Sequence, residues 1–186
     1  MTFFFSLYKP IILGHEDTLT AKISGPYARG DAKRLRQIIL EALSSFTIFF
    51  LVFVALPALF VSKLFALMHV HQNIAADINL SILLFLPSMY LIGICETLKG
   101  FLINFGEIDL AGLTSVLASM VGIAGCVFFI LVLKLGSMGV ILSMLLFALG
   151  SFGLNMANYW RVVVPHLENM EKESSIGGEG SEERLD

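Results

Sequence analysis

The stretch IILEALSSFTIFFLVFVALPALFV, residues Ile38–Val61, decides the fold of this chain. It holds a single charged residue, Glu41, and it lacks the alternation of polar and apolar faces that helices of soluble proteins show. Three further apolar runs follow it, namely Ile78–Cys95, Leu110–Leu133 and Met138–Ala157. Because about 20 residues of helix cross a hydrocarbon layer of ~30 Å, the sequence predicts four transmembrane helices.

The composition also indicates that lipid is the solvent. Of the 186 residues, 56% are hydrophobic and only 15% are charged, whereas soluble domains carry roughly 25% charged residues. We therefore predict an all-α fold, a polytopic membrane helix bundle with four full transmembrane helices. The short apolar stretch Phe3–Leu13 lacks the basic start and the cleavage site of a signal peptide, and we interpret it as a partial N-terminal membrane helix.

The distribution of basic residues predicts the orientation, since cytoplasmic segments of membrane proteins are enriched in Lys and Arg. Six of the 12 basic residues precede the first span: Lys9, Lys22, Arg29, Lys33, Arg34 and Arg36. The expected outer loops, Ser62–Asp77 and Lys134–Ser137, hold only Lys63 and Lys134. Both termini are therefore expected in the cytoplasm.

The approach to the first span has its own signals. Gly25-Pro26 and Gly30 are expected to break helices, and Asp31 is placed to cap the first transmembrane helix. The basic residues that follow, Lys33, Arg34 and Arg36, are expected to lie among lipid headgroups.

Two domains are predicted. Residues 1–161 form the transmembrane part, which ends at Asn158-Tyr159-Trp160-Arg161, where aromatic and basic side chains suit the membrane interface. Residues Val162–Asp186 are more acidic than basic and contain the Gly-rich piece Gly177-Gly178-Glu179-Gly180. This composition predicts a disordered cytoplasmic tail.

Enzyme signatures are missing from the sequence. No GxSxG, HExxH or Walker A motif occurs, and the histidines are scattered. His69 and His71 are two positions apart and cannot share a helix face, which argues against a metal site. Cys95 and Cys126 lie in apolar runs without a CxxC pattern and are interpreted as packing residues. We predict no catalytic residue, no metal site and no cofactor, and a membrane-embedded enzyme is the least supported class.

Two polar residues in the spans are candidates for function. Glu96 is a carboxylate within reach of the hydrocarbon region, where ionisable groups are costly and usually functional or paired. Lys99 follows at i+3, so a structural ion pair is the favoured interpretation and a role in ion coupling is the alternative. Asn155 is the best candidate to line a cavity, because the backbone of its own helix offers its side-chain amide few hydrogen-bond partners.

Small residues in the last two spans predict helix packing. Gly122, Gly125, Gly150 and Gly153 allow close approach of helix backbones, which is how helices associate in lipid. The predicted packing stripes are Ser115/Ser119/Gly122 and Gly150/Gly153.

Four short motifs follow one another along the chain. They are Asp17-Thr18-Leu19 with Tyr27-Ala28-Arg29-Gly30-Asp31, then Glu96-Thr97-Leu98-Lys99-Gly100-Phe101-Leu102 with Asn104-Phe105-Gly106, then Leu135-Gly136-Ser137-Met138-Gly139 with Ser143, and finally Asn158-Tyr159-Trp160. Their order and spacing over residues 14–165 resemble those of eukaryotic multidrug and toxic compound extrusion (MATE) transporters. The matching family regions are the end of helix two, helix four, the turn between helices five and six, and the end of helix six.

This resemblance implies a secondary transporter in which two six-helix lobes hold the substrate between them and alternate access. It implies exchange of protons or sodium for organic cations, xenobiotics or metabolites, in a plasma, vacuolar or endosomal membrane. The chain matches only helix two through helix six, so a truncated form is expected that needs a second lobe or self-association. The family's coupling acids lie largely outside the matched part, and none is carried over.

The sequence departs from the family pattern at Lys22 and at Ile103-Asn104, and Leu19 and Tyr27 are further apart than usual. An alternative function therefore stays open, that of a non-transporting membrane subunit or scaffold. Such a protein would use the small-residue helix faces for contacts with partners.

Overall fold

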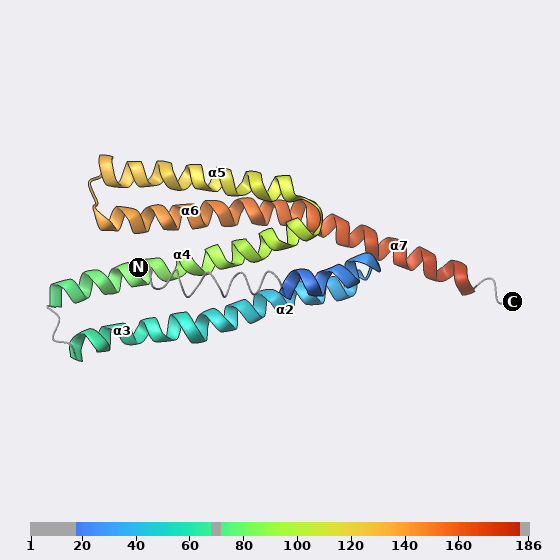
Figure 1. Ribbon diagram of the computed structural model, residues 1–186, viewed down its shortest axis with the longest axis horizontal. Helices are drawn as coiled ribbons and strands as arrows, with labels where there is room; N and C mark the ends of the chain where they lie inside the picture. The colour runs from blue at the N-terminus through green and yellow to red at the C-terminus, as the bar shows by residue number, and fades with distance from the viewer. Residues whose placement is uncertain (1–17, 68–71, 183–186) are drawn as a thin grey trace. The chain divides into compact units, whose positions relative to one another are not determined.

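The structure is a computed structural model and describes residues 18–67 and 72–182. Its regular elements are all helical, beginning with a helix over residues 18–28. The others are α2 (Ala32–Phe50), η1 (Leu51–Ala55), α3 (Leu56–Leu67), α4 (Gln72–Asn104), α5 (Ile108–Val127), η2 (Phe128–Val132), α6 (Ser137–Asn158), η3 (Tyr159–Val163) and α7 (Val164–Glu182). Figure 1 shows their order along the chain.

The predicted fold class is confirmed. Among residues 18–67 and 72–182, four helical stretches are long and apolar enough to cross a membrane: Ala32–Ala58, Ile78–Asn104, Ile108–Val132 and Ser137–Glu173. Each contains most or all of one of the apolar runs that the sequence shows. The partial N-terminal helix predicted at Phe3–Leu13 lies outside the described residues.

The predicted outer loop Ser62–Asp77 is much too long. Helix α3 continues to Leu67 and α4 begins at Gln72, so only residues 68–71 separate them. The segment contains neither Gly nor Pro, and polar side chains alone do not end a helix. His69 and His71 lie outside the described residues.

The predicted disordered tail is wrong over α7, which is helical from Val164 to Glu182. The helix begins with apolar residues that the sequence interpretation gave too little weight. Val163 and Leu167, four positions apart and thus on one face, are 0% and 2% exposed. Their burial anchors the start of this segment, at the end of η3 and in the first turn of α7.

Two of the three π-helical turns precede a proline at the same spacing. Turn η1 is followed by Leu56-Pro57, and turn η3 is followed by Val164-Pro165. Proline has no N–H, and its ring clashes with the carbonyl four residues earlier in an α-helix. The wider turn bonds across five residues instead, as from the Leu56 N–H to the Leu51 carbonyl, so both helices continue past their prolines.

The described residues form two compact units, and several helices contribute to both. The first unit comprises residues 18–43, 96–111 and 155–182. The second comprises residues 44–67, 72–95 and 112–154. These limits differ from the domain boundary predicted at Val162, because α7 belongs to the first unit.

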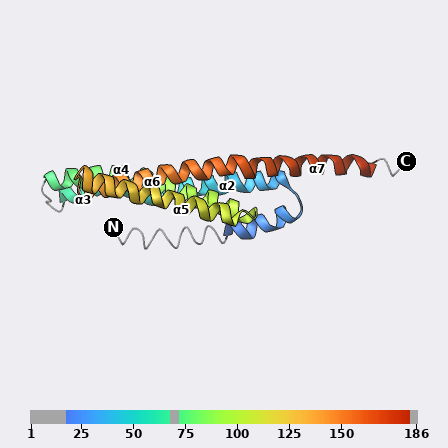
Figure 2. The ribbon, with the colours of Figure 1, turned by 90° about the horizontal axis from the view of Figure 1, so that it is seen from above.

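Two helix-to-helix turns in the first unit have the same backbone hydrogen-bond pattern. At Gly30 (φ +67°), the Gly30 N–H bonds to the Tyr27 carbonyl, and the Asp31 N–H bonds to the Pro26 carbonyl. At Gly106 (φ +88°), the same two bonds run from Gly106 and Glu107 back to α4. Both are Schellman caps, which need a residue in the left-handed region. Figure 2 shows the first of them, between the helix over residues 18–28 and α2.

An aromatic cluster joins three elements of the first unit. The ring of Tyr27 lies edge-on to Phe105 at 5.2 Å and stacks on His166 of α7 at 6.0 Å. The Tyr27 hydroxyl is 3.4 Å from Nε2 of His166. Next to it, Asn104 Nδ2 donates to Thr20 Oγ1 at 3.2 Å, which ties the end of α4 to the helix over residues 18–28.

The second unit contains the hairpin of α5 and α6, which lie side by side in Figure 1. A Cβ atom added to Gly122 would lie 3.0 Å from Cβ of Phe147 on α6. One added to Gly139 would lie 3.1 Å from the backbone of Phe129. These distances are tighter than ordinary van der Waals contact, so the two helices approach as closely as they do only because glycine has no side chain.

We expect Gly122→Leu to destabilise the protein by about 1–3 kcal/mol or more, because the new side chain meets a Cβ that cannot rotate away. Gly153→Leu is the matched control, since nothing lies within 4 Å of an added Cβ on Gly153 of the same hairpin. The free energy of unfolding in detergent micelles measures both. Equal losses in the two variants would contradict this account of the hairpin.

Candidate functional site

Glu96 and Lys99, the two candidates on α4, form an ion pair. Lys99 Nζ lies 3.5 Å from Glu96 Oε2, and the side chains are 28% and 35% exposed. The pair runs one turn along a single helix, in the favourable order of acid before base. This geometry supports the structural interpretation of Glu96 over a role in ion coupling.

Asn155 lies inside the fold. It is 3% exposed, and Ser151 and Ser143 on the same helix are 8% and 5% exposed. Spacings of four and eight residues place the three on one face of α6. Asn155 is therefore buried in this conformation, and its role in lining a cavity stays a prediction.

The small residues singled out in the sequence serve different purposes. Gly122 and Gly125 lie against Phe147 and Leu146 of α6 within the chain. An added Cβ on Gly150 would make ordinary contact with Val121 at 3.7 Å, and one on Gly153 would meet nothing. The small-residue faces of α5 and α6 therefore contact mainly each other within the hairpin.

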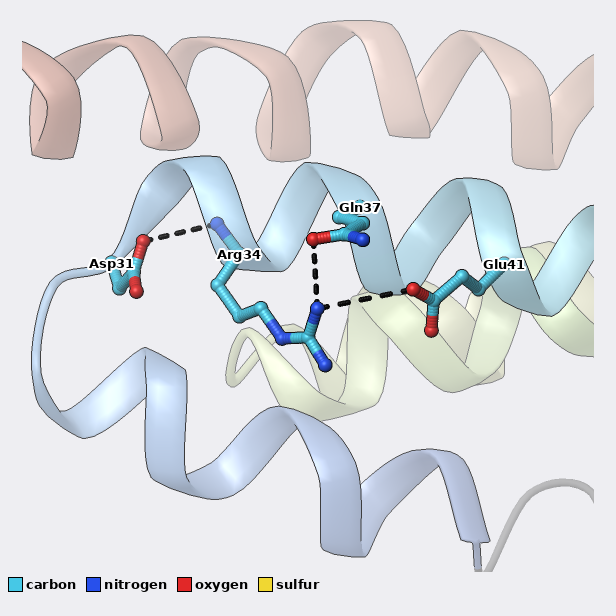
Figure 3. Close-up of polar contacts among 4 residues, drawn as sticks. All are labelled: Asp31, Arg34, Gln37 and Glu41. Carbon is cyan, nitrogen blue, oxygen red and sulfur yellow. Dashed lines mark hydrogen bonds and ion pairs between the residues drawn. The ribbon is translucent and has the colours of Figure 1, made fainter.

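The structure reveals a polar face on α2 that the sequence interpretation missed. Asp31 Oδ1 accepts the backbone N–H of Arg34 at 3.0 Å, which is the expected N-cap. Arg34 Nη1 donates to Gln37 Oε1 at 2.7 Å and lies 3.9 Å from Glu41 Oε1. Figure 3 shows these four side chains in a row along the helix.

The direction of the Arg34 side chain is informative. Arginine near the end of a membrane helix usually extends toward the headgroups and keeps its charge in water. Arg34 extends the other way, along α2 toward Glu41, deeper in the predicted span (Figure 3). That direction is favourable only if the surroundings of this face are polar.

The exposed faces of α2 and α5 differ in chemistry. The exposed positions of α2 are Lys33, Arg34, Arg36, Gln37, Leu40, Glu41, Ser44, Ser45 and Ile48. Beyond its first turn, which holds the exposed Asp109, the exposed positions of α5 carry no charge: Gly112, Leu113, Val116, Leu117, Ser119, Met120, Val121, Ile123, Ala124 and Val127. The face of α5 suits lipid, whereas the face of α2 suits water or protein.

The signal for this face was present in the sequence. Asp31, Arg34, Gln37, Glu41 and Ser45 are spaced by three or four residues, which is the period of a helix face. The average hydropathy of Ile38–Val61 conceals it, because the apolar second half of the run outweighs the first. The prediction that this run lacks a polar face is therefore wrong for α2.

Comparison with protein-family models, curated proteins and solved structures finds no match for this chain. Function is accordingly argued from its own residues. Within residues 18–67 and 72–182, no three His, Cys, Asp or Glu side chains are grouped so that they could hold a metal ion.

Replacement of the cap tests the polar row. We expect Asp31→Ala to destabilise the protein by about 1 kcal/mol, because the Arg34 N–H loses its acceptor. Asp31→Asn should cost much less, since its amide oxygen also caps helices well. Chemical unfolding in micelles compares them, and an alanine variant as stable as the parent would refute the cap.

Proposed function

We propose that this chain is a transmembrane half-lobe of a cation-coupled transporter that exports organic cations or metabolites. The observation that carries the proposal is the exposed polar face of α2. A transporter lobe needs one face that lines a hydrated path, with the remainder in contact with lipid.

The exposure of Glu41 supports this interpretation. The continuous helix from Ala32 to Leu67 is about 54 Å long at 1.5 Å per residue, which exceeds a ~30 Å hydrocarbon layer by ~12 Å at each end. Glu41 lies ~14 Å along the helix from Ala32, and hence at the edge of that layer. A carboxylate that faces lipid is costly even there, so the half-exposed Glu41 favours a hydrated or protein-lined environment.

Three glycines of the motifs that resemble those of MATE transporters lie in turns between helices. Gly30, Gly106 and Gly136 each belong to one of these motifs, and each has a positive φ in a turn between helices. The resemblance therefore rests largely on residues that set helix turns. It supports a lobe of this type and is the basis for expecting organic cations or metabolites as the solute.

The orientation follows from the charges. Within the described residues, only Lys63 and Lys134 of the Lys and Arg belong to the second unit. We propose that the first unit faces the cytoplasm, with both chain ends on that side. The α2 face would be completed by a second lobe, with water between them.

The scaffold alternative has less support. It needs free small-residue faces, yet Gly122 and Gly125 are occupied by Phe147 and Leu146 of the same chain. A protein partner would also suit the polar face of α2, so the occupied small-residue faces carry the distinction.

The test is efflux of a fluorescent organic cation from proteoliposomes that contain only this chain, with and without a proton gradient. We expect efflux that depends on the gradient. Glu41→Gln should reduce its rate by about tenfold or more, which corresponds to ~1.4 kcal/mol. Glu96→Gln is the matched control and should retain most of the rate, because Glu96 is paired with Lys99.

Absence of efflux from folded, uniformly oriented protein would contradict transport by this chain and favour the scaffold. Gradient-dependent efflux that is lost in Glu96→Gln and kept in Glu41→Gln would retain the transporter but move the critical carboxylate to α4.

A further inference from the structure

The Arg34 side chain on α2 has one close neighbour and one more distant neighbour. Its Nη1 donates to Gln37 Oε1 at 2.7 Å, which is a short charge-assisted hydrogen bond. The same Nη1 lies 3.9 Å from Glu41 Oε1, beyond hydrogen-bond distance. The neutral amide of Gln37 therefore holds the guanidinium, while the Glu41 carboxylate attracts its charge without a hydrogen bond from Nη1.

The packing of α2 keeps these three side chains away from the protein interior. Leu35, Ile39 and Ala42 lie on the packed side of the helix and are no more than 5% exposed. The side chains of Arg34 and Glu41 are 49% and 47% exposed. Figure 3 shows the guanidinium between Gln37 and Glu41, on the surface of the helix. A solute can therefore approach the carboxylate without displacing packed side chains.

The attraction between Arg34 and Glu41 is weak enough to be exchanged. Water screens two half-exposed charges 3.9 Å apart, and exposed ion pairs of this kind contribute little to stability. A second cation that contacts Glu41 would lie close to the guanidinium and be repelled by it. The bond to Gln37 maintains this repulsion, because an arginine without it extends toward water and away from the carboxylate.

We propose that the Glu41 carboxylate binds a monovalent cation, and that Arg34, held in place by Gln37, is a built-in competitor that weakens this binding. The inference rests on the proposed function, since it takes the α2 face to be hydrated. The cation is the transported organic cation or the coupling sodium ion. A transporter has to release what it binds, and a fixed positive charge beside the carboxylate keeps the affinity low.

Equilibrium dialysis of the purified full-length chain in neutral detergent tests the proposal. Radiolabelled tetraethylammonium is used in one series and radiolabelled sodium in the other. We expect one of these cations to bind, and Glu41→Gln to abolish its binding. Binding of tetraethylammonium identifies the transported solute class, and binding of sodium identifies the coupling ion, so either supports the proposal.

The variants of the other two residues measure the competition. Arg34→Gln should bind the same cation about fivefold or more tightly than the parent, because a unit positive charge beside the site is removed. Gln37→Leu should tighten binding in the same direction by a smaller factor, since the freed guanidinium moves toward water. Gln37 is thus a positioning residue, and its effect appears in the cation affinity.

Arg36→Gln is the matched control. It removes the same charge two positions along α2, on nearly the opposite side of the helix from Arg34. Arg36 Nη2 lies 3.1 Å from Glu171 Oε2 of α7, so its charge is directed toward another helix. We expect this variant to change the affinity by less than about twofold. The unfolding midpoint without cation shows whether each variant is folded.

The proposal is overturned if neither cation binds, or if binding persists in Glu41→Gln. It is also overturned if Arg34→Gln keeps the parent affinity, or if the affinity rises equally in Arg36→Gln. Dialysis involves no gradient, so the proposed function is tested separately. Absence of efflux with binding that depends on Arg34 would remove transport and leave this site, whereas efflux with binding that is independent of Arg34 would do the reverse.

Discussion

Backbone hydrogen bonding is the constraint on which the rest of this structure depends. In a hydrocarbon layer, no water satisfies a free N–H or C=O, so each span must bond its own backbone. The chain keeps this rule even where proline interrupts it. At Pro57 and Pro165 the helix widens into a π-helical turn and continues, and at Gly30 and Gly106 Schellman caps take up carbonyls at the helix ends. The helices are consequently longer, and their connections shorter, than the apolar runs alone suggest.

Because lipid does not solvate polar groups, exposed polar side chains indicate which helix faces lie away from lipid. Beyond its first turn, the exposed positions of α5 carry no charge, as lipid requires. Along α2 the exposed face carries Arg34, Gln37 and Glu41, and the arginine extends along the helix toward the carboxylate. One face of this chain is therefore built for a surrounding other than lipid, which is the basis of the transport proposal.

Sequence reasoning succeeded where a local rule was sufficient. Span length and composition predicted four membrane helices, and the position of Asp31 before a run of helix formers predicted its cap. It failed where burial decided the outcome. Glycine and acidic residues predicted a disordered tail, but Val163 and Leu167 bury one face of the helical segment that includes α7.

The sequence by itself determined the fold class, the number of spans and the separation of charge, because these depend on side-chain transfer into lipid and on helix length, which are additive along the chain. The tertiary structure decided which charges are paired. Arg36 and Glu171 are far apart in sequence and 3.1 Å apart in space, whereas Lys22 and Arg29 have no such partner. It also decided which glycines are contact points, since Gly122 has Phe147 beside it and Gly153 has nothing. Pairing and contact depend on which helix faces meet, and this is a property of the packed chain that composition and spacing do not contain.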